Sequence, residues 1–229
     1  MRSPNHGDRR GQRPELIVLH YTGMADAVSA RARLCDPTAE VSAHWLIDER
    51  GEVIPLVDET RRAWHAGAGS WQGRDDVNSR SIGIEIANPG DRPFTAAQMR
   101  ALETLLTQVM ARWRLDPEAV IAHSDMAPGR KIDPGPRFDW EWLARQGLAS
   151  FSRPRPNDPA PPLGPSLDAL GYPPADPATR LAAFRLRHRP WATGPESRAD
   201  RQTAARLLLH ENIPGDAPQG RGAAPPFDG

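Results

Sequence analysis

Short apolar runs in the first 123 residues predict five β-strands. Leu16–His20 is apolar up to its last residue, which is typical of a buried strand. Ser81–Ile86 alternates small or polar residues with isoleucine, so Glu85 is expected on the face opposite Ile84 and Ile86. The other predicted strands are His44–Asp48 and Val53–Val57, which flank a hairpin turn, and Val120–His123.

An apolar residue at every third or fourth position predicts one long helix between the last two strands. Thr95 and Gln98 form a capping-box pattern at its start. A shorter helix is predicted over Ala27–Leu34. Strands interspersed with helices predict an α/β domain over residues 14–150, with a central mixed β-sheet flanked by helices. The apolar stripe of the long helix consists of Met99, Leu102, Leu106, Val109 and Trp113.

The composition changes after residue 150. Nine prolines fall between Ser152 and Pro177, and this density predicts an extended Pro-rich linker over residues 151–164. Three short helical patterns then predict a small three-helix module over residues 165–212. The Gly- and Pro-rich residues 213–229 predict a disordered tail. The three helical patterns cover Ser166–Leu170, Pro177–His188 and Ala199–Leu209.

The charge balance excludes several classes of protein. The chain has 29 basic and 29 acidic residues, so its net charge of zero gives no electrostatic basis for nucleic-acid binding. Lys131 is the only lysine, and the remaining basic residues are arginines. A single cysteine, Cys35, excludes an intrachain disulfide framework. The longest apolar runs, of about four residues, are far too short for a transmembrane segment.

Two histidines and one aspartate form a candidate metal site. His20 and His123 each end a predicted strand, and Asp133 follows in a loop rich in Gly and Pro. Two imidazoles and a carboxylate suit Zn²⁺, with the fourth position open for water, and they also suit non-haem iron. On the residues alone, a buried and hydrogen-bonded histidine at each strand end is an equally good interpretation.

Five motifs occur in an order that resembles a known enzyme family. Together they resemble the zinc-dependent N-acetylmuramoyl-L-alanine amidases of the AmpD and AmiD type, whose fold is shared with peptidoglycan-recognition proteins and phage amidases. The resemblance covers roughly residues 14–148. The motifs are LIVLHYT at Leu16–Thr22, WHAG at Trp64–Gly67, SIGIEI at Ser81–Ile86, His123, and GRKIDPGPRFDW at Gly129–Trp140.

The resemblance also implies roles for individual residues. It implies one Zn²⁺ per chain held by His20, His123 and Asp133, with Glu85 and Lys131 as catalytic residues. The implied reaction is hydrolysis of the amide between N-acetylmuramic acid, or its anhydro form, and L-alanine in peptidoglycan or muropeptides. In this chemistry Glu85 moves a proton, and Lys131 places a positive charge beside the developing oxyanion.

Further residues are candidates for substrate binding. His65 lies in the WHAG motif, and either a substrate contact or loop packing would explain it. Trp64, Trp71 and Asn88 carry aromatic faces or an amide that suit a sugar or peptide ligand, with packing as the alternative. Three other histidines are expected at the surface: His6, His188 and His210.

The C-terminal segment has a resemblance of its own. Leu170–Tyr172, Ala183–His188 and Asp200–Leu208 resemble a peptidoglycan-binding three-helix module. The alternative is a small helical appendage that packs on the catalytic domain. Two rival functions stay open: a non-catalytic peptidoglycan-recognition protein that uses the same groove, and hydrolysis of another amide or ester.

Two features of the chain favour different compartments. The polar and Arg-rich start has no apolar run long enough for a signal peptide, which predicts a cytoplasmic protein that acts on recycled anhydro-muropeptides. A monomer is the simplest expectation for its oligomeric state. A wall-binding module on a Pro-rich linker favours polymeric peptidoglycan instead. The second interpretation requires a periplasmic or envelope-associated protein with a different true start or export route.

Overall fold

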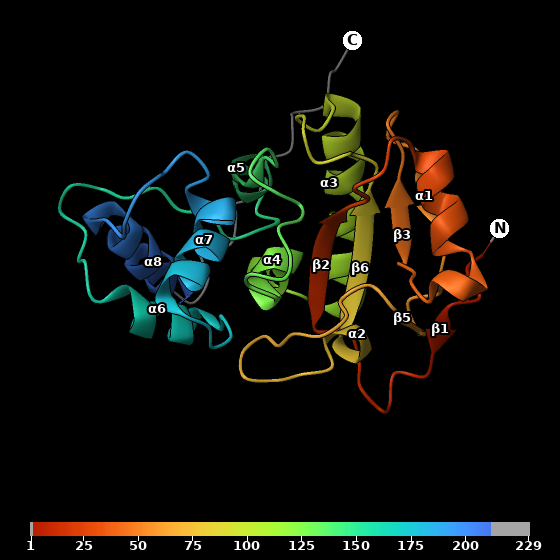
Figure 1. The fold of residues 1–229 in the computed structure, drawn as a ribbon, viewed down its shortest axis with the longest axis horizontal. Helices are drawn as coiled ribbons and strands as arrows, with labels where there is room; N and C mark the ends of the chain where they lie inside the picture. The colour runs from red at the N-terminus through yellow and green to blue at the C-terminus, as the bar shows by residue number, and fades with distance from the viewer. Residues whose placement is uncertain (1, 212–229) are drawn as a thin grey trace, which may run out of the picture.

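A five-stranded mixed sheet forms the centre of the molecule, for which the computed structural model describes residues 2–211 (Figure 1). The strand order is β4-β3-β6-β2-β7, and all neighbours are parallel except the hairpin of β3 and β4. This confirms the predicted α/β class. The strands are β2 (Leu16–Tyr21), β3 (Trp45–Ile47), β4 (Val53–Pro55), β6 (Ser81–Ile86) and β7 (Val120–Ala122), beside a small antiparallel pair of β1 (His6–Gly7) and β5 (Arg62–Ala63).

Helices cover the sheet and extend the molecule to one side. Helices α1 and α3 cover opposite faces of the sheet, since α1 packs on Leu46 and α3 packs on its neighbour Ile47. In Figure 1, α6, α7 and α8 gather beyond α4 and α5, at the end of the molecule away from α1. No helix within residues 2–211 has the length and apolar character needed to cross a membrane. The helices are α1 (Ala27–Leu34), α2 (Val77–Arg80), α3 (Ala96–Trp113), α4 (His123–Met126), α5 (Trp140–Arg145), α6 (Leu163–Leu170), α7 (Pro177–His188) and α8 (Arg198–Glu211).

The long helix α3 begins and packs as its sequence predicts. The Thr95 hydroxyl accepts a hydrogen bond from the backbone of Gln98, whose side chain accepts one from the Thr95 backbone. This capping box satisfies backbone groups that the first turn leaves without partners. The apolar stripe of α3 then packs on Ile17 and Leu19 of β2 and on the isoleucines of β6.

The opposite face of β2 packs against the C-terminal helices. Leu16 and Val18 alternate with the residues that face α3, and they share a buried cluster with Leu167 and Phe184. The three helices predicted for this segment are present, and α6 begins at Leu163, inside the predicted linker. Residues 151–162 contain no helix or strand, and the predicted tail, 213–229, lies outside the described residues. The C-terminal helices therefore pack directly on the sheet domain.

Two expectations about histidines are wrong. Strand β7 ends at Ala122, and His123 instead begins α4, because the Asp125 side chain accepts the Ala122 N–H at 2.9 Å and starts a helical turn. His188 is buried, with its ring against Phe184 at 4.9 Å between centroids. His188 lies between two arginines in the sequence, and charged neighbours are typical of a surface position. Arg187 is itself buried, so this pattern does not indicate exposure here. His6 is partly buried, and the side chain of His210 is outside the described residues.

Two buried histidines make the fold sensitive to acid. Burial, reinforced by Arg9, lowers the pKa of His44 to about 3. Burial and the adjacent Arg187 lower the pKa of His188 well below its ordinary value. Below about pH 6.5 the unfolded chain binds protons at these positions and the folded chain does not. Their contribution to stability is therefore complete above that pH and declines as the pH falls.

We predict that the free energy of unfolding decreases as the pH falls from about 6.5 towards about 4.5, by up to about 1.4 kcal/mol per pH unit for each such histidine. His188→Leu should reduce this slope by one histidine's share. Urea unfolding with EDTA at several pH values measures it. Leu167→Ala, in the buried cluster that contains Phe184, should lower stability equally at every pH. An unchanged slope in His188→Leu would contradict the prediction.

Candidate metal centre

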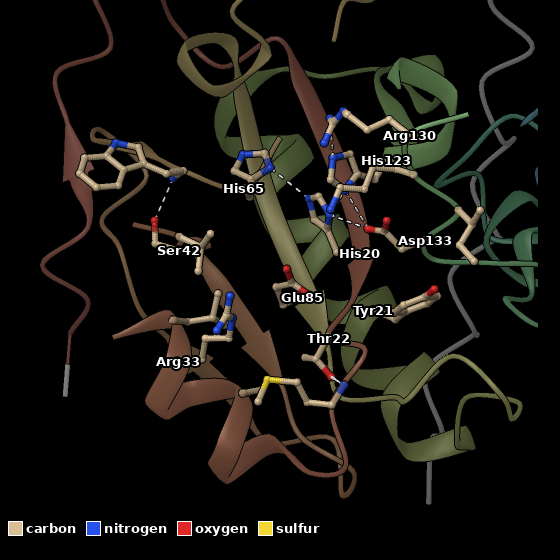
Figure 2. Close-up of a pocket in the computed structure, with 17 residues that line it drawn as sticks. His20, Tyr21, Thr22, Arg33, Ser42, His65, Glu85, His123, Arg130 and Asp133 are labelled. Carbon is tan, nitrogen blue, oxygen red and sulfur yellow. Dashed lines mark hydrogen bonds and ion pairs between the residues drawn. The ribbon is translucent and has the colours of Figure 1, made fainter. Parts of the chain in front are cut away.

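The pleat of two parallel strands places His20 beside Glu85. Leu16, Val18 and His20 share one face of β2, and burial of the first two anchors the strand below the histidine. The register between β2 and β6 pairs His20 with Glu85. Figure 2 shows both side chains on the same face, near the carboxyl ends of their strands.

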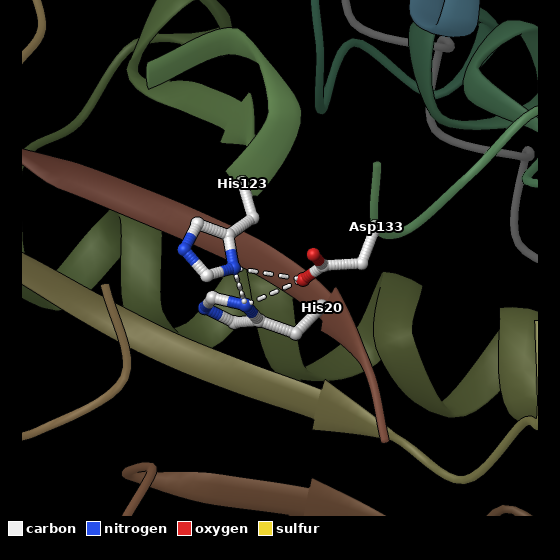
Figure 3. A group of neighbouring side chains, drawn as sticks. All are labelled: His20, His123 and Asp133. Carbon is white, nitrogen blue, oxygen red and sulfur yellow. Dashed lines mark hydrogen bonds and ion pairs between the residues drawn. The ribbon is translucent and has the colours of Figure 1, made fainter. Parts of the chain in front are cut away.

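His20, His123 and Asp133 converge on one point. His20 Nδ1 and His123 Nδ1 lie 2.9 Å apart, and Asp133 Oδ2 lies 2.8 Å and 2.9 Å from them respectively (Figure 3). All three residues are buried. Their atoms come from β2, from the start of α4 and from the loop before α5. The structure thus brings together three residues that span 113 positions of the chain.

The outer nitrogen of His20 ends a chain of hydrogen bonds. His20 Nε2 is 3.0 Å from His65 Nδ1, and His65 Nε2 is 3.2 Å from the Ser81 hydroxyl, which donates to the Val77 carbonyl at 2.5 Å. Because a carbonyl only accepts, Ser81 must accept from His65 Nε2–H. His65 Nδ1 then accepts from His20 Nε2–H. This order leaves a lone pair on His20 Nδ1.

A carbonyl fixes the proton of His123 in the same way. His123 Nε2 donates to the Ala66 carbonyl at 2.9 Å, and that carbonyl also accepts from Arg130 Nη2 at 2.6 Å. In the neutral ring of His123, Nδ1 is therefore the unprotonated nitrogen. The WHAG loop thus orients both histidines, one through the His65 side chain and the other through the backbone of Ala66.

His20 Nδ1, His123 Nδ1 and Asp133 Oδ2 are three hydrogen-bond acceptors that face one another without a donor, and such a group of atoms is suited to binding a cation. Burial, with the neighbouring His123, lowers the pKa of His20 to about 4, so the ring is neutral near pH 7. Two neutral imidazoles and one carboxylate suit Zn²⁺, and the hydrogen bonds to the outer nitrogens are typical of histidine ligands. His20, His123 and Asp133 thus fit a zinc ion with three protein ligands.

Glu85 presents an unpartnered carboxylate oxygen near these ligands. Its Oε2 is buried and has no hydrogen-bond partner within residues 2–211. Burial, and then repulsion from Asp133, raises the pKa of Glu85 well above its ordinary value, while Lys131 acts in the opposite direction. A carboxyl group in such a state is suited to exchanging a proton with a ligand.

A cavity of about 510 Å³ opens over the metal ligands and Glu85 (Figure 2). Lys131, His65 and Trp64 also line it, so most of the predicted site residues meet there. On the opposite wall the cavity is lined by residues of α1 and of the segment before β3, among them Arg33 and Ser42. Its size and mixture of polar and apolar walls are typical of a ligand site.

Two predicted substrate contacts lie outside this cavity. Asn88 is buried and shapes its own loop, accepting from the Gly90 N–H at 2.7 Å and donating to the Arg92 carbonyl at 3.1 Å. Trp71 is buried against Tyr172, with ring centroids 5.2 Å apart. In this structure both side chains therefore pack inside the protein, which is the alternative to a substrate contact given for them above.

Ser81 and Gly83 are site residues that sequence reasoning missed. Ser81 anchors the hydrogen-bond chain to His20, and a Cβ on Gly83 would overlap the ring of His65. The signal was present in the SIGIEI motif, because residues 81, 83 and 85 share one face of a strand. The size of Gly83 could have indicated that a side chain from elsewhere lies over the strand. Arg33 and Arg130 carried no comparable signal.

Comparisons with known proteins match the part of the chain that contains the candidate site. The family model described as N-acetylmuramoyl-L-alanine amidase matches residues 10–136. AmiD of Escherichia coli K12 is 39% identical over 155 residues, which are 61% of this chain and 55% of AmiD. In sequence, the chain therefore spans about half the length of this relative.

Two solved structures resemble the whole arrangement. E. coli AmiD in complex with the substrate anhydro-N-acetylmuramic acid-L-Ala-D-γ-Glu-L-Lys has a TM-score of 0.76 and 31% identity, over 93% of each chain. AmpDH3 from Pseudomonas aeruginosa, in complex with anhydromuramic pentapeptide, has a TM-score of 0.77 and 28% identity, over 92% of this chain and 96% of its own. Both matches continue beyond residue 136, into the C-terminal helices. Since the family match alone covers more than half of the residues, the chain belongs to the N-acetylmuramoyl-L-alanine amidase family.

Proposed function

We propose that this protein is a zinc-dependent hydrolase that cleaves the amide between N-acetylmuramic acid, or its anhydro form, and L-alanine. The observation that carries the proposal is the convergence of His20, His123 and Asp133 at a cavity that also contains the unpartnered carboxyl of Glu85. Membership of the amidase family supports the same reaction.

The ligands of two structural relatives support the substrate. AmiD is described with an anhydro-muramyl tripeptide and AmpDH3 with an anhydro-muramyl pentapeptide. A cavity of about 510 Å³ that is open to solvent has room for the sugar and the first residues of such a peptide. We therefore propose muropeptides and the stem-peptide junctions of peptidoglycan as the substrate class. Trp64 also lines the cavity, and we propose it as a contact for this ligand.

Different residues of the cavity contribute to different steps of amide hydrolysis. The chemistry that a bound zinc ion supplies is Lewis-acid polarisation of a carbonyl and acidification of water. Glu85 accepts a proton from the attacking water and returns it to the leaving nitrogen of L-alanine. Lys131 stabilises the negative charge that develops on the carbonyl oxygen. His65 keeps His20 in the tautomer that presents Nδ1 to the metal.

Muropeptide digestion tests this function. We expect the zinc-loaded chain to release free stem peptide from anhydro-muropeptides, as detected by mass spectrometry. Chelation should abolish release, and added Zn²⁺ should restore it. Parallel digestion of intact sacculi compares polymer with fragment. A chain that holds zinc or muropeptide but releases no stem peptide would instead be a recognition protein, and release at another bond would be a different hydrolase.

Glu85→Gln should retain zinc but lose activity. The amide keeps the size of the side chain but cannot exchange a proton, so kcat should fall by about 10²- to 10⁴-fold. Zinc content measured alongside turnover separates this effect from loss of the metal. Glu52→Gln, at an exposed position outside the cavity, should behave like the parent enzyme. Comparable kcat values for Glu85→Gln and the parent would remove Glu85 from the mechanism.

Lys131→Arg should also lower kcat, by about tenfold or more, although the charge is kept. A guanidinium is planar and forked, so it cannot replace a compact ammonium beside the oxyanion without loss. The reverse change Arg137→Lys is a matched control, since Arg137 is exposed and lies in the same motif. We expect Arg137→Lys to leave kcat unchanged. Full activity in Lys131→Arg would contradict a point-charge role.

A further inference from the structure

The helix that begins with His123 also carries a buried acid, Asp125, whose hydrogen-bond partners do not include the candidate metal ligands. No part of Asp125 is exposed to solvent. Its Oδ2 accepts the Ala122 N–H at 2.9 Å, a bond that closes the turn at the start of α4. A carboxylate without solvent needs further donors to stay charged.

Those donors come from the C-terminal segment, with Tyr172 in the loop after α6 and Arg187 in α7. The Tyr172 hydroxyl donates to Asp125 Oδ1 at 2.8 Å, and Arg187 Nη1 donates to Asp125 Oδ2 at 2.8 Å. Arg187 is itself held firmly, because its Nη2 donates to the Ser150 carbonyl at 3.0 Å and its guanidinium lies 4.3 Å from the centre of the Trp140 ring. Two of the three donors to Asp125 therefore lie beyond the Pro-rich segment.

Helix α4 connects this acid to two of the three metal ligands. His123 is the first residue of α4, two positions before Asp125. The next residue, Ser124, donates its backbone N–H to the carbonyl of Asp133 at 3.1 Å. A displacement of this turn would therefore shift the His123 ring and disturb the hydrogen bond to the backbone of Asp133.

We propose that Tyr172 and Arg187 are positioning residues for the metal centre, which they stabilise through Asp125. The inference rests on the proposed zinc site. It gives the C-terminal helices a task inside the catalytic unit, whatever surface they present to the cell wall. Arg187 neutralises the buried carboxylate, Tyr172 fixes its orientation, and together they hold α4 where His123 and Asp133 meet His20.

Zinc affinity is the measurement that tests this role. Tyr172→Phe removes one hydroxyl and keeps the ring against Trp71 and Phe184. Arg187→Met removes the charge and keeps much of the apolar stem. Competition with a chromogenic chelator should show about tenfold weaker zinc binding for each variant, within the range usual for groups that orient metal ligands. Arg187→Lys, which can restore one bond to Asp125, should recover part of the affinity.

A variant in the buried core of the C-terminal helices controls for a general loss of stability. Leu207→Ala removes buried volume from the same cluster of C-terminal helices, and no hydrogen bond of Asp125 involves this residue. At a matched loss of thermal stability, Leu207→Ala should bind zinc like the parent. The visible absorption of bound Co²⁺ should likewise change in Tyr172→Phe and Arg187→Met but not in Leu207→Ala.

If Tyr172→Phe and Arg187→Met matched Leu207→Ala in zinc affinity and in Co²⁺ spectrum, the positioning role would be overturned. These readouts need no turnover, so the two proposals fail in different ways. A parent chain that binds zinc and releases no stem peptide overturns the proposed function and leaves this comparison intact. A parent chain that binds no zinc overturns both.

Discussion

The parallel register of β2 and β6 is the constraint on which the site depends. It pairs His20 with Glu85 on one face, while the isoleucines of β6 turn to the other face and pack under α3. A slip of one residue would bury Glu85 in the core and expose an isoleucine to the cavity. The same apolar contacts that hold the sheet together therefore fix the distance between a metal ligand and the acid beside it.

Hydrogen-bond partners outside the metal site determine which ring nitrogen of His20 and of His123 carries the proton. His20 is oriented by His65 and Ser81, and His123 by the backbone carbonyl of Ala66, so every outer nitrogen has a fixed partner. Each lone pair is then directed inward before any ion arrives. A site prepared in this way avoids the rearrangement that free imidazole rings would need on binding a cation, so the WHAG loop contributes to the candidate metal centre through the two histidines.

The sequence predicted those parts of the fold and site whose cause is local. Period-two and period-3.6 patterns placed β6 and α3, and the motifs singled out His20, His123, Asp133 and Glu85, which the structure brings to one cavity. It misplaced His123 at a strand end, because the turn that starts α4 depends on Asp125, whose other donors lie up to 62 residues away. It could not separate Trp64 from Trp71 or Asn88, since the path of each loop decides whether a side chain faces the cavity or the core.

Some of the arginines are buried at positions that a lysine could not fill. Arg9 is buried and donates from Nε to the carbonyl of Glu59 and from Nη1 to the carbonyls of Ser79 and Ser81, while its Nη2 lies 2.9 Å from His44 Nε2. Arg187 joins a carboxylate, a carbonyl and an aromatic face in the same manner. An ammonium group cannot reach several fixed acceptors in one plane, so lysine would leave buried oxygens unpaired at such positions. Arginine here connects segments distant in sequence, whereas the single lysine lines the cavity, where one compact charge is enough.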